Sequence, residues 1–135
     1  MTFCCLRVHS LAICDVVVIC IFIFFLQSVA EIDGYIQSRR QACQERKLTL
    51  QPQIIAVISP NGAPFYAVKV EQLLYKFQNV IKAVDTAFKL HFVLNASYSY
   101  ECSQTWTFVQ KVFYKIQTKE DKPGSALREF MGDLN

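Results

Sequence analysis

The sequence predicts an α+β fold, in which a small antiparallel sheet of two or three strands is followed by an antiparallel helical hairpin packed on one face. Three short stretches rich in β-branched and aromatic residues follow one another between residues 53 and 77. Two stretches with apolar residues at helical spacing come next. About 105 residues follow a hydrophobic N-terminal segment, which is enough for one domain with a modest core.

The first thirty residues are set apart from this domain by a hydrophobic run over residues 11–26. The uninterrupted apolar part of that run has the length of the h-region of a secretory signal peptide. Ser28 and Ala30 have the small-x-small spacing that signal peptidase accepts. We therefore expect residues 1–30 to be a signal peptide that is cleaved between Ala30 and Glu31, and the protein to be secreted.

Two other interpretations of the hydrophobic run remain. The run could be a signal anchor, and the basic residues that follow it would then keep the rest of the chain in the cytoplasm. That interpretation gives a single-pass membrane or intracellular protein that meets the membrane only through this segment. The run could also be a translated thymine-rich non-coding tract, because Phe, Ile, Val, Leu and Cys have thymine-rich codons.

Residues 31–47 are polar and predict a linker or a short helix, and the α+β domain is expected over residues 48–135. Residues 53–59 predict a buried strand. Residues 65–70 alternate as a second strand, after an Asn61-Gly62 turn. Residues 73–77 predict a third strand, after a tight reversal.

Two helices are predicted after the strands. Asn79 suits the N-cap of a helix over residues 80–95, and Ser103 suits the N-cap of a helix over residues 104–117. Both carry an apolar stripe, and a loop of about seven residues joins them, which predicts the antiparallel hairpin. The tail after Pro123-Gly124 predicts a short terminal helix or a frayed end.

Charge argues only weakly for a nucleic-acid partner. The net charge of the whole chain is +3, without a dense basic patch in the sequence. The side chains of Tyr66, Lys69, Tyr75 and Lys76 could still line one sheet face, as the stacking platforms of single-strand binders do. Nucleic-acid binding is therefore the weaker alternative to binding another protein.

Two features depend on secretion. Cys43 and Cys102 are the cysteines outside the N-terminal segment, and a disulfide between them would stabilise the fold by ~4 kcal/mol on the loop-entropy argument. Two separate thiols are the alternative. Asn95 begins an Asn-Ala-Ser sequon, so it is the predicted N-glycosylation site.

The sequence predicts no catalytic, cofactor-binding or metal-binding residue. His91 could form a catalytic dyad with Cys102, Asp85 or Glu71, but it lies in the apolar stripe of a predicted helix, which favours a packed structural histidine. The chain has no Cys-x-x-Cys pair and no glycine-rich phosphate loop. We therefore expect no enzymatic activity and no cofactor.

The chain after residue 47 resembles a region found in uncharacterised predicted animal proteins, some of them linked to mobile elements. The resemblance rests on Lys82-Ala83-Val84-Asp85 with Phe88-Lys89, and on Trp106 with Phe108-Val109-Gln110-Lys111. It covers roughly residues 48–134 and excludes the hydrophobic run. It implies no catalytic residues, and it favours an intracellular protein or a hydrophobic run that is translated non-coding sequence.

These observations together predict a non-enzymatic interaction module with an unknown protein partner. The motivation is a complete core pattern without a reactive constellation of side chains. The alternative is a nucleic-acid-associated domain of a mobile-element-derived gene.

Overall fold

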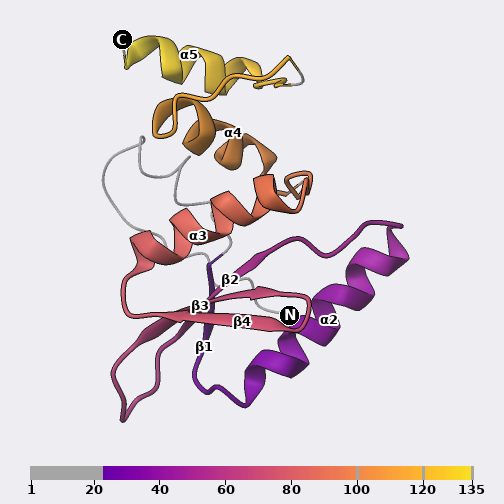
Figure 1. The fold of residues 1–135 in the computed structure, drawn as a ribbon, viewed down its shortest axis with the longest axis vertical. Coiled ribbons are helices and arrows are strands. Elements are labelled where there is room, and N and C mark those ends of the chain that lie inside the picture. Colours follow the sequence, from indigo (N-terminus) through magenta and orange to yellow (C-terminus); the bar gives the residue numbers. More distant parts are fainter. Residues whose placement is uncertain (1–22, 100, 120, 135) are drawn as a thin grey trace. The chain divides into compact units, whose positions relative to one another are not determined.

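The computed structural model describes residues 23–99, 101–119 and 121–134 (Figure 1). The described residues form two compact units, which meet in the sequence at Ser97 and Tyr98. The first unit contains a sheet and two helices, and the second contains two helices. The molecule is α+β, as the sequence predicts.

A mixed sheet of four strands forms the centre of the first unit. Its order is β1 (Ile23–Leu26), β2 (Gln53–Val57), β3 (Phe65–Val70) and β4 (Leu73–Phe77), with β1 parallel to β2 and the other neighbours antiparallel. The prediction of two or three antiparallel strands is therefore wrong. The added strand lies at the end of the hydrophobic run, and a four-residue strand inside a longer apolar run has no periodicity of its own.

The helix α2 (Glu31–Glu45) connects the two parallel strands, which need such a crossover. Glu31 and Asp33 lie in its first turn, where negative charge favours the helix dipole. Its Ile32 and Ile36 are buried in a cluster on one sheet face, together with Ile55, Val57 and Ala67. The cluster is what holds the β1–α2–β2 crossover against the sheet.

The end of α2 is closed by hydrogen bonds of the Schellman type. The Leu48 N–H donates to the Cys43 carbonyl at 2.8 Å, and the Lys47 N–H donates to the Gln44 carbonyl at 3.0 Å. Lys47 has a φ of 56°, the left-handed conformation that this motif requires. The chain can therefore turn back toward β2 directly after the helix.

The helix α3 (Val80–Val93) packs on β2, β3 and β4. Its buried side chains are Ala83, Ala87, Phe88 and His91. Side chains alternate between the two faces of a strand, so Ile54 and Val68 point away from the α2 cluster, and both are buried. The sheet therefore lies between α2 on one face and α3 on the other (Figure 1).

The predicted cap of α3 is confirmed. The Asn79 side chain accepts a hydrogen bond from the Ile81 N–H at 2.8 Å. Asp85 and Lys89, one helical turn apart, form an ion pair with 2.7 Å between Nζ and Oδ2 on the exposed side of the helix.

The second unit contains α4 (Ser103–Val112) and α5 (Ser125–Asp133), which pack together with the Phe108 and Phe130 rings 5.5 Å apart. The predicted antiparallel hairpin is wrong, because α3 packs on the sheet and α4 packs with α5. An apolar stripe shows that a helix has a packing partner but does not say which. The helix α4 also ends at Val112, earlier than the predicted residue 117, and Lys115 then turns the chain at a φ of 55°.

Candidate protein-interaction surface

The strand β4 forms one edge of the sheet, and no described residue pairs with its outer side. An edge strand presents unpaired backbone N–H and C=O groups, which can pair with another chain. Many proteins guard such an edge with proline, a bulge or a projecting charge. The sequence of β4, Leu-Leu-Tyr-Lys-Phe, contains no proline and one charge.

The side chains of β4 alternate between the two faces of the sheet. Leu74 packs against the cluster beneath α2, so Lys76 lies on that same face. Leu73, Tyr75 and Phe77 lie on the α3 face. Leu73 is 56% exposed and Tyr75 is 39% exposed, so this apolar row remains open to a partner.

Lys76, the one charged residue of β4, does not protect the open edge against pairing with another strand. Lys76 Nζ lies 5.4 Å from the centre of the Phe65 ring, within the range of a cation–π contact. Phe65 is on β3, so the ammonium group lies over its own sheet and not beyond the edge. We call the outer edge of β4, with the side chains of Leu73 and Tyr75, the β4 surface.

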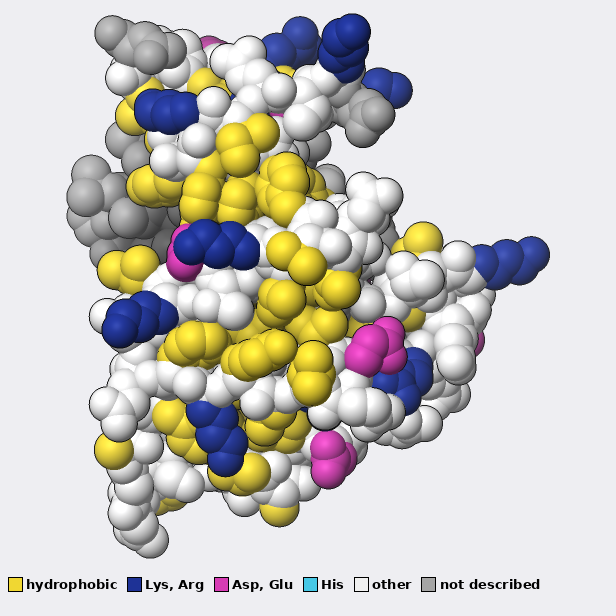
Figure 2. All heavy atoms as spheres, in the orientation of Figure 1, with side chains coloured by type: hydrophobic (Ala, Val, Ile, Leu, Met, Phe, Trp, Pro, Cys, Tyr) yellow, Lys and Arg dark blue, Asp and Glu magenta, His cyan; other side chains and the backbone are white. Residues whose placement is uncertain are grey.

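Figure 2 shows hydrophobic side chains gathered over β4 and along α3. The helix contributes exposed apolar side chains of its own: Ile81, Phe92 and Val93. Single exposed apolar residues are common on proteins, whereas apolar side chains such as Leu73 and Tyr75 on an open strand edge are typical of an interaction surface.

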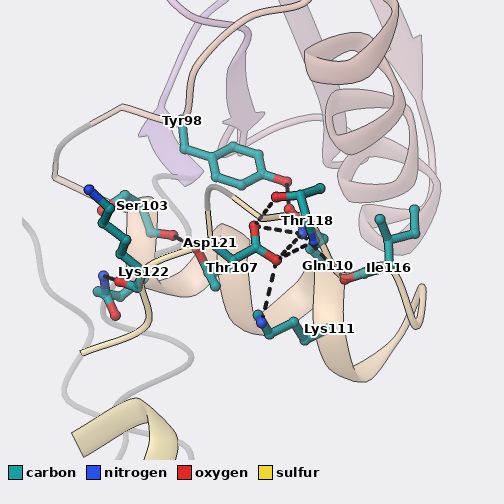
Figure 3. Close-up of polar contacts among 10 residues, drawn as sticks. Tyr98, Ser103, Thr107, Gln110, Lys111, Ile116, Thr118, Asp121 and Lys122 are labelled. Carbon is teal, nitrogen blue, oxygen red and sulfur yellow. Dashed lines mark hydrogen bonds and ion pairs between the residues drawn. The ribbon is translucent and has the colours of Figure 1, made fainter. Parts of the chain in front are cut away.

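The densest polar cluster in the second unit surrounds Asp121 (Figure 3). The Thr118 N–H donates to Oδ2 at 2.8 Å, and the Thr118 hydroxyl donates to Oδ1 at 2.7 Å. The Gln110 amide donates to both oxygens at 3.0 Å, and Lys111 Nζ lies 3.4 Å from Oδ2. The Tyr98 hydroxyl donates to Gln110 Oε1 at 2.7 Å.

The hydrogen bonds change the acidity of this cluster. Burial raises the pKa of the Asp121 carboxyl, but the hydrogen bonds from Thr118, Gln110 and Lys111 outweigh burial and lower that pKa to about 2. Burial, and then the charge of Asp121, raise the pKa of Tyr98 to about 12. The carboxylate is saturated with donors, so the cluster ties the segment after α4 to that helix and offers no reactive group.

Replacing Asp121 with Asn should destabilise the second unit by about 2 kcal/mol, because the Asn amide would set N–H groups against the Gln110 and Lys111 donors. The folded-state pKa is lowered, so the charge contributes stability above the unfolded pKa of about 3.8 and loses it as pH falls toward 2. Urea unfolding followed by the fluorescence of Trp106, the only tryptophan, measures both effects.

The exposed Asp133 on α5 provides the matched control, and Asp133→Asn should leave the urea midpoint nearly unchanged. Equal slopes of stability against pH between pH 4 and 2, in wild type and Asp121→Asn, would contradict this account of the cluster. The Thr118-x-x-Asp121 spacing is a weak signal of this cluster in the sequence, because a carboxylate can accept from a backbone N–H three residues earlier.

The predicted cleavage point lies between β1 and α2. Ala30 and Glu31 are exposed, and Ala30 directly precedes the helix. Cleavage there would separate β1 from the rest of the sheet. Secretion stays a prediction, and most of the hydrophobic run lies outside the described residues.

The two secretion-dependent features lie in different surroundings. Asn95 is exposed directly after α3, at a φ of 49°, and Ser97 of its sequon is exposed as well. Cys43 is half-buried on α2 in the first unit. Cys102 is buried in the second unit, with its Sγ 2.7 Å from Ser99 Oγ. Glycosylation and the disulfide both stay predictions.

His91 is buried on α3, as its place in the apolar stripe predicts. Its Nδ1 lies 2.7 Å from the Ala87 carbonyl oxygen, which can only accept, so Nδ1 carries the proton. Burial lowers the pKa of His91, and the hydrogen bond to Ala87 offsets part of that shift. Within the described residues, no group of three or more His, Cys, Asp or Glu side chains could hold a metal ion.

The side chains proposed for a nucleic-acid platform do not share a face. Tyr66 and Tyr75 lie on the α3 face of the sheet, whereas Lys69 and Lys76 lie on the α2 face. A stacking platform needs aromatic rings beside the basic groups that contact phosphates. The register therefore weakens the case for this platform.

Among the described residues, none of the helices is both long and apolar enough to cross a membrane. In comparison with known proteins, the chain matches no protein-family model, no curated protein and no solved structure.

Proposed function

We propose that this chain is a non-enzymatic interaction module and that it binds another protein strand along the β4 surface. The observation that carries the proposal is the open edge of β4, where Leu73 and Tyr75 are exposed and the Lys76 ammonium group lies over the Phe65 ring of the neighbouring strand. A partner strand would take its affinity from backbone hydrogen bonds and its specificity from the alternating side chains.

Native capture with C-terminally tagged full-length chain tests the proposal. Leu73→Lys should abolish capture of the specific partner, because it places a charge in the apolar row. Ile58→Lys is the matched control, since Ile58 is 47% exposed in the same unit but lies outside β4. A partner that is retained equally by both variants would overturn the assignment of the surface.

The alternative, nucleic-acid association, is tested with the same variants in a separate binding assay. Labelled single-stranded DNA and RNA are offered to the purified chain at low salt, where phosphate contacts are strongest. Salt-sensitive binding that Leu73→Lys leaves intact would favour the alternative. We expect none, because the aromatic and basic side chains of the sheet are on opposite faces.

The N-terminal residue of the tagged protein decides where the module works. Glu31 at the N-terminus of protein from the medium would support secretion after cleavage at Ala30. An intact hydrophobic segment would support an anchored or intracellular module that keeps β1 in the sheet.

A further inference from the structure

We infer that the strand that pairs with β4 comes from a second copy of this chain, so that two sheets join edge to edge about a two-fold axis at Tyr75. This inference rests on the proposed function and names its partner. It follows from the pairing possibilities of the five residues Leu73–Phe77.

A two-fold axis perpendicular to the sheet places β4 antiparallel to its own copy, and each face of one sheet continues the same face of the other. With Tyr75 at the axis, the two Tyr75 side chains lie opposite each other. Leu73 of each copy then lies opposite Phe77 of the other. The whole α3-face row is apolar or aromatic in this arrangement, and such cross-strand pairs stabilise antiparallel strands.

The charge on the other face fits the same arrangement. Lys76 of each copy lies opposite Leu74 of the other, so the two ammonium groups do not oppose each other. Each ammonium group is already drawn back over the Phe65 ring of its own copy. The interface between the two β4 strands therefore contains no directly opposed like charges.

The neighbouring registers fit less well. An axis at Lys76 would set the two lysines directly opposite, which is unfavourable. An axis at Leu74 would set Phe77 opposite Glu71, which lies in the turn before the strand at a φ of 49°. Only the axis at Tyr75 pairs all five residues of β4 with residues of β4.

Sedimentation velocity of the full-length chain over a range of concentrations tests the inference. Wild type should dimerise, and Tyr75→Lys or Tyr75→Glu alone should each weaken the dimer by about tenfold or more, because each sets two like charges opposite one another. An equimolar mixture of the two variants should restore the dimer, since the two residues then attract. Ile58→Lys should dimerise like wild type.

The mixture distinguishes two explanations of a weakened dimer: like charges opposed in the predicted register, and a general loss of the fold. A mixture that does not dimerise, or single variants that dimerise like wild type, would overturn the axis at Tyr75. Leu73→Asp provides a second variant at a more exposed position and should also weaken the dimer. Wild type that stays monomeric overturns the second copy as partner, while Leu73-dependent capture of a different protein would still support the proposed function.

Discussion

A chain that begins at Glu31 should be less stable than one that begins at Ile23 by at least about 3 kcal/mol, because it lacks β1. Leu26 packs against the buried cluster beneath α2, and the Phe24 ring lies 4.3 Å from the Tyr35 ring. Without β1, the strand β2 becomes an edge, although all five of its residues are buried.

Urea unfolding followed by far-ultraviolet circular dichroism measures the difference between the two chains. Both lack residues 1–22, so the comparison isolates residues 23–30. Equal midpoints would show that β1 adds nothing to the sheet and would remove the physical objection to cleavage after Ala30. A large loss would instead mean that such cleavage leaves a damaged sheet.

Phe88→Ala should destabilise the first unit by about 3–5 kcal/mol, since it removes a large side chain from a packed core and leaves a cavity. Phe88 is 2% exposed on the face of α3 that packs on the sheet. The urea midpoint should fall at an unchanged slope, and amide exchange in β2 and β3 should accelerate.

Phe92→Ala is the control, on the same helix and with the same change of side chain. Phe92 is 46% exposed, and its ring lies 5.0 Å from that of Phe88, so its loss should cost about 1 kcal/mol. If the two variants lost equal stability, Phe88 would not be the residue that anchors α3 to the sheet.

Patterns of neighbouring residues in the sequence predicted the helices and strands that depend on local interactions. The alternation of residues 65–70 and 73–77 matches β3 and β4, and Asn79 caps α3 through its own side chain. The strand β1 escaped prediction because its partner is more than twenty residues away and its composition also suits a signal peptide. The prediction of a helical hairpin was wrong because the apolar stripe of α4 can pack equally well against α5.

The β4 surface could be predicted only in part. The sequence marks Tyr75 and Lys76 as members of a strand, but exposure depends on which strand lies at the edge and on which helix covers each face. The position of the Lys76 ammonium group depends on Phe65, which is a diagonal neighbour on β3. These are tertiary relations, and no spacing along the chain encodes them.

The parallel pairing of β1 with β2 has a consequence during synthesis on the ribosome. Ile23 pairs with Ile54, so β1 is made first but must wait for its partner while 31 further residues are added. At about 5–20 residues per second, this delay lasts roughly 2–6 s. During that time the apolar residues of β1 have no strand partner. If the chain is exported, as the hydrophobic run predicts, targeting factors and the folding sheet would compete for the same segment.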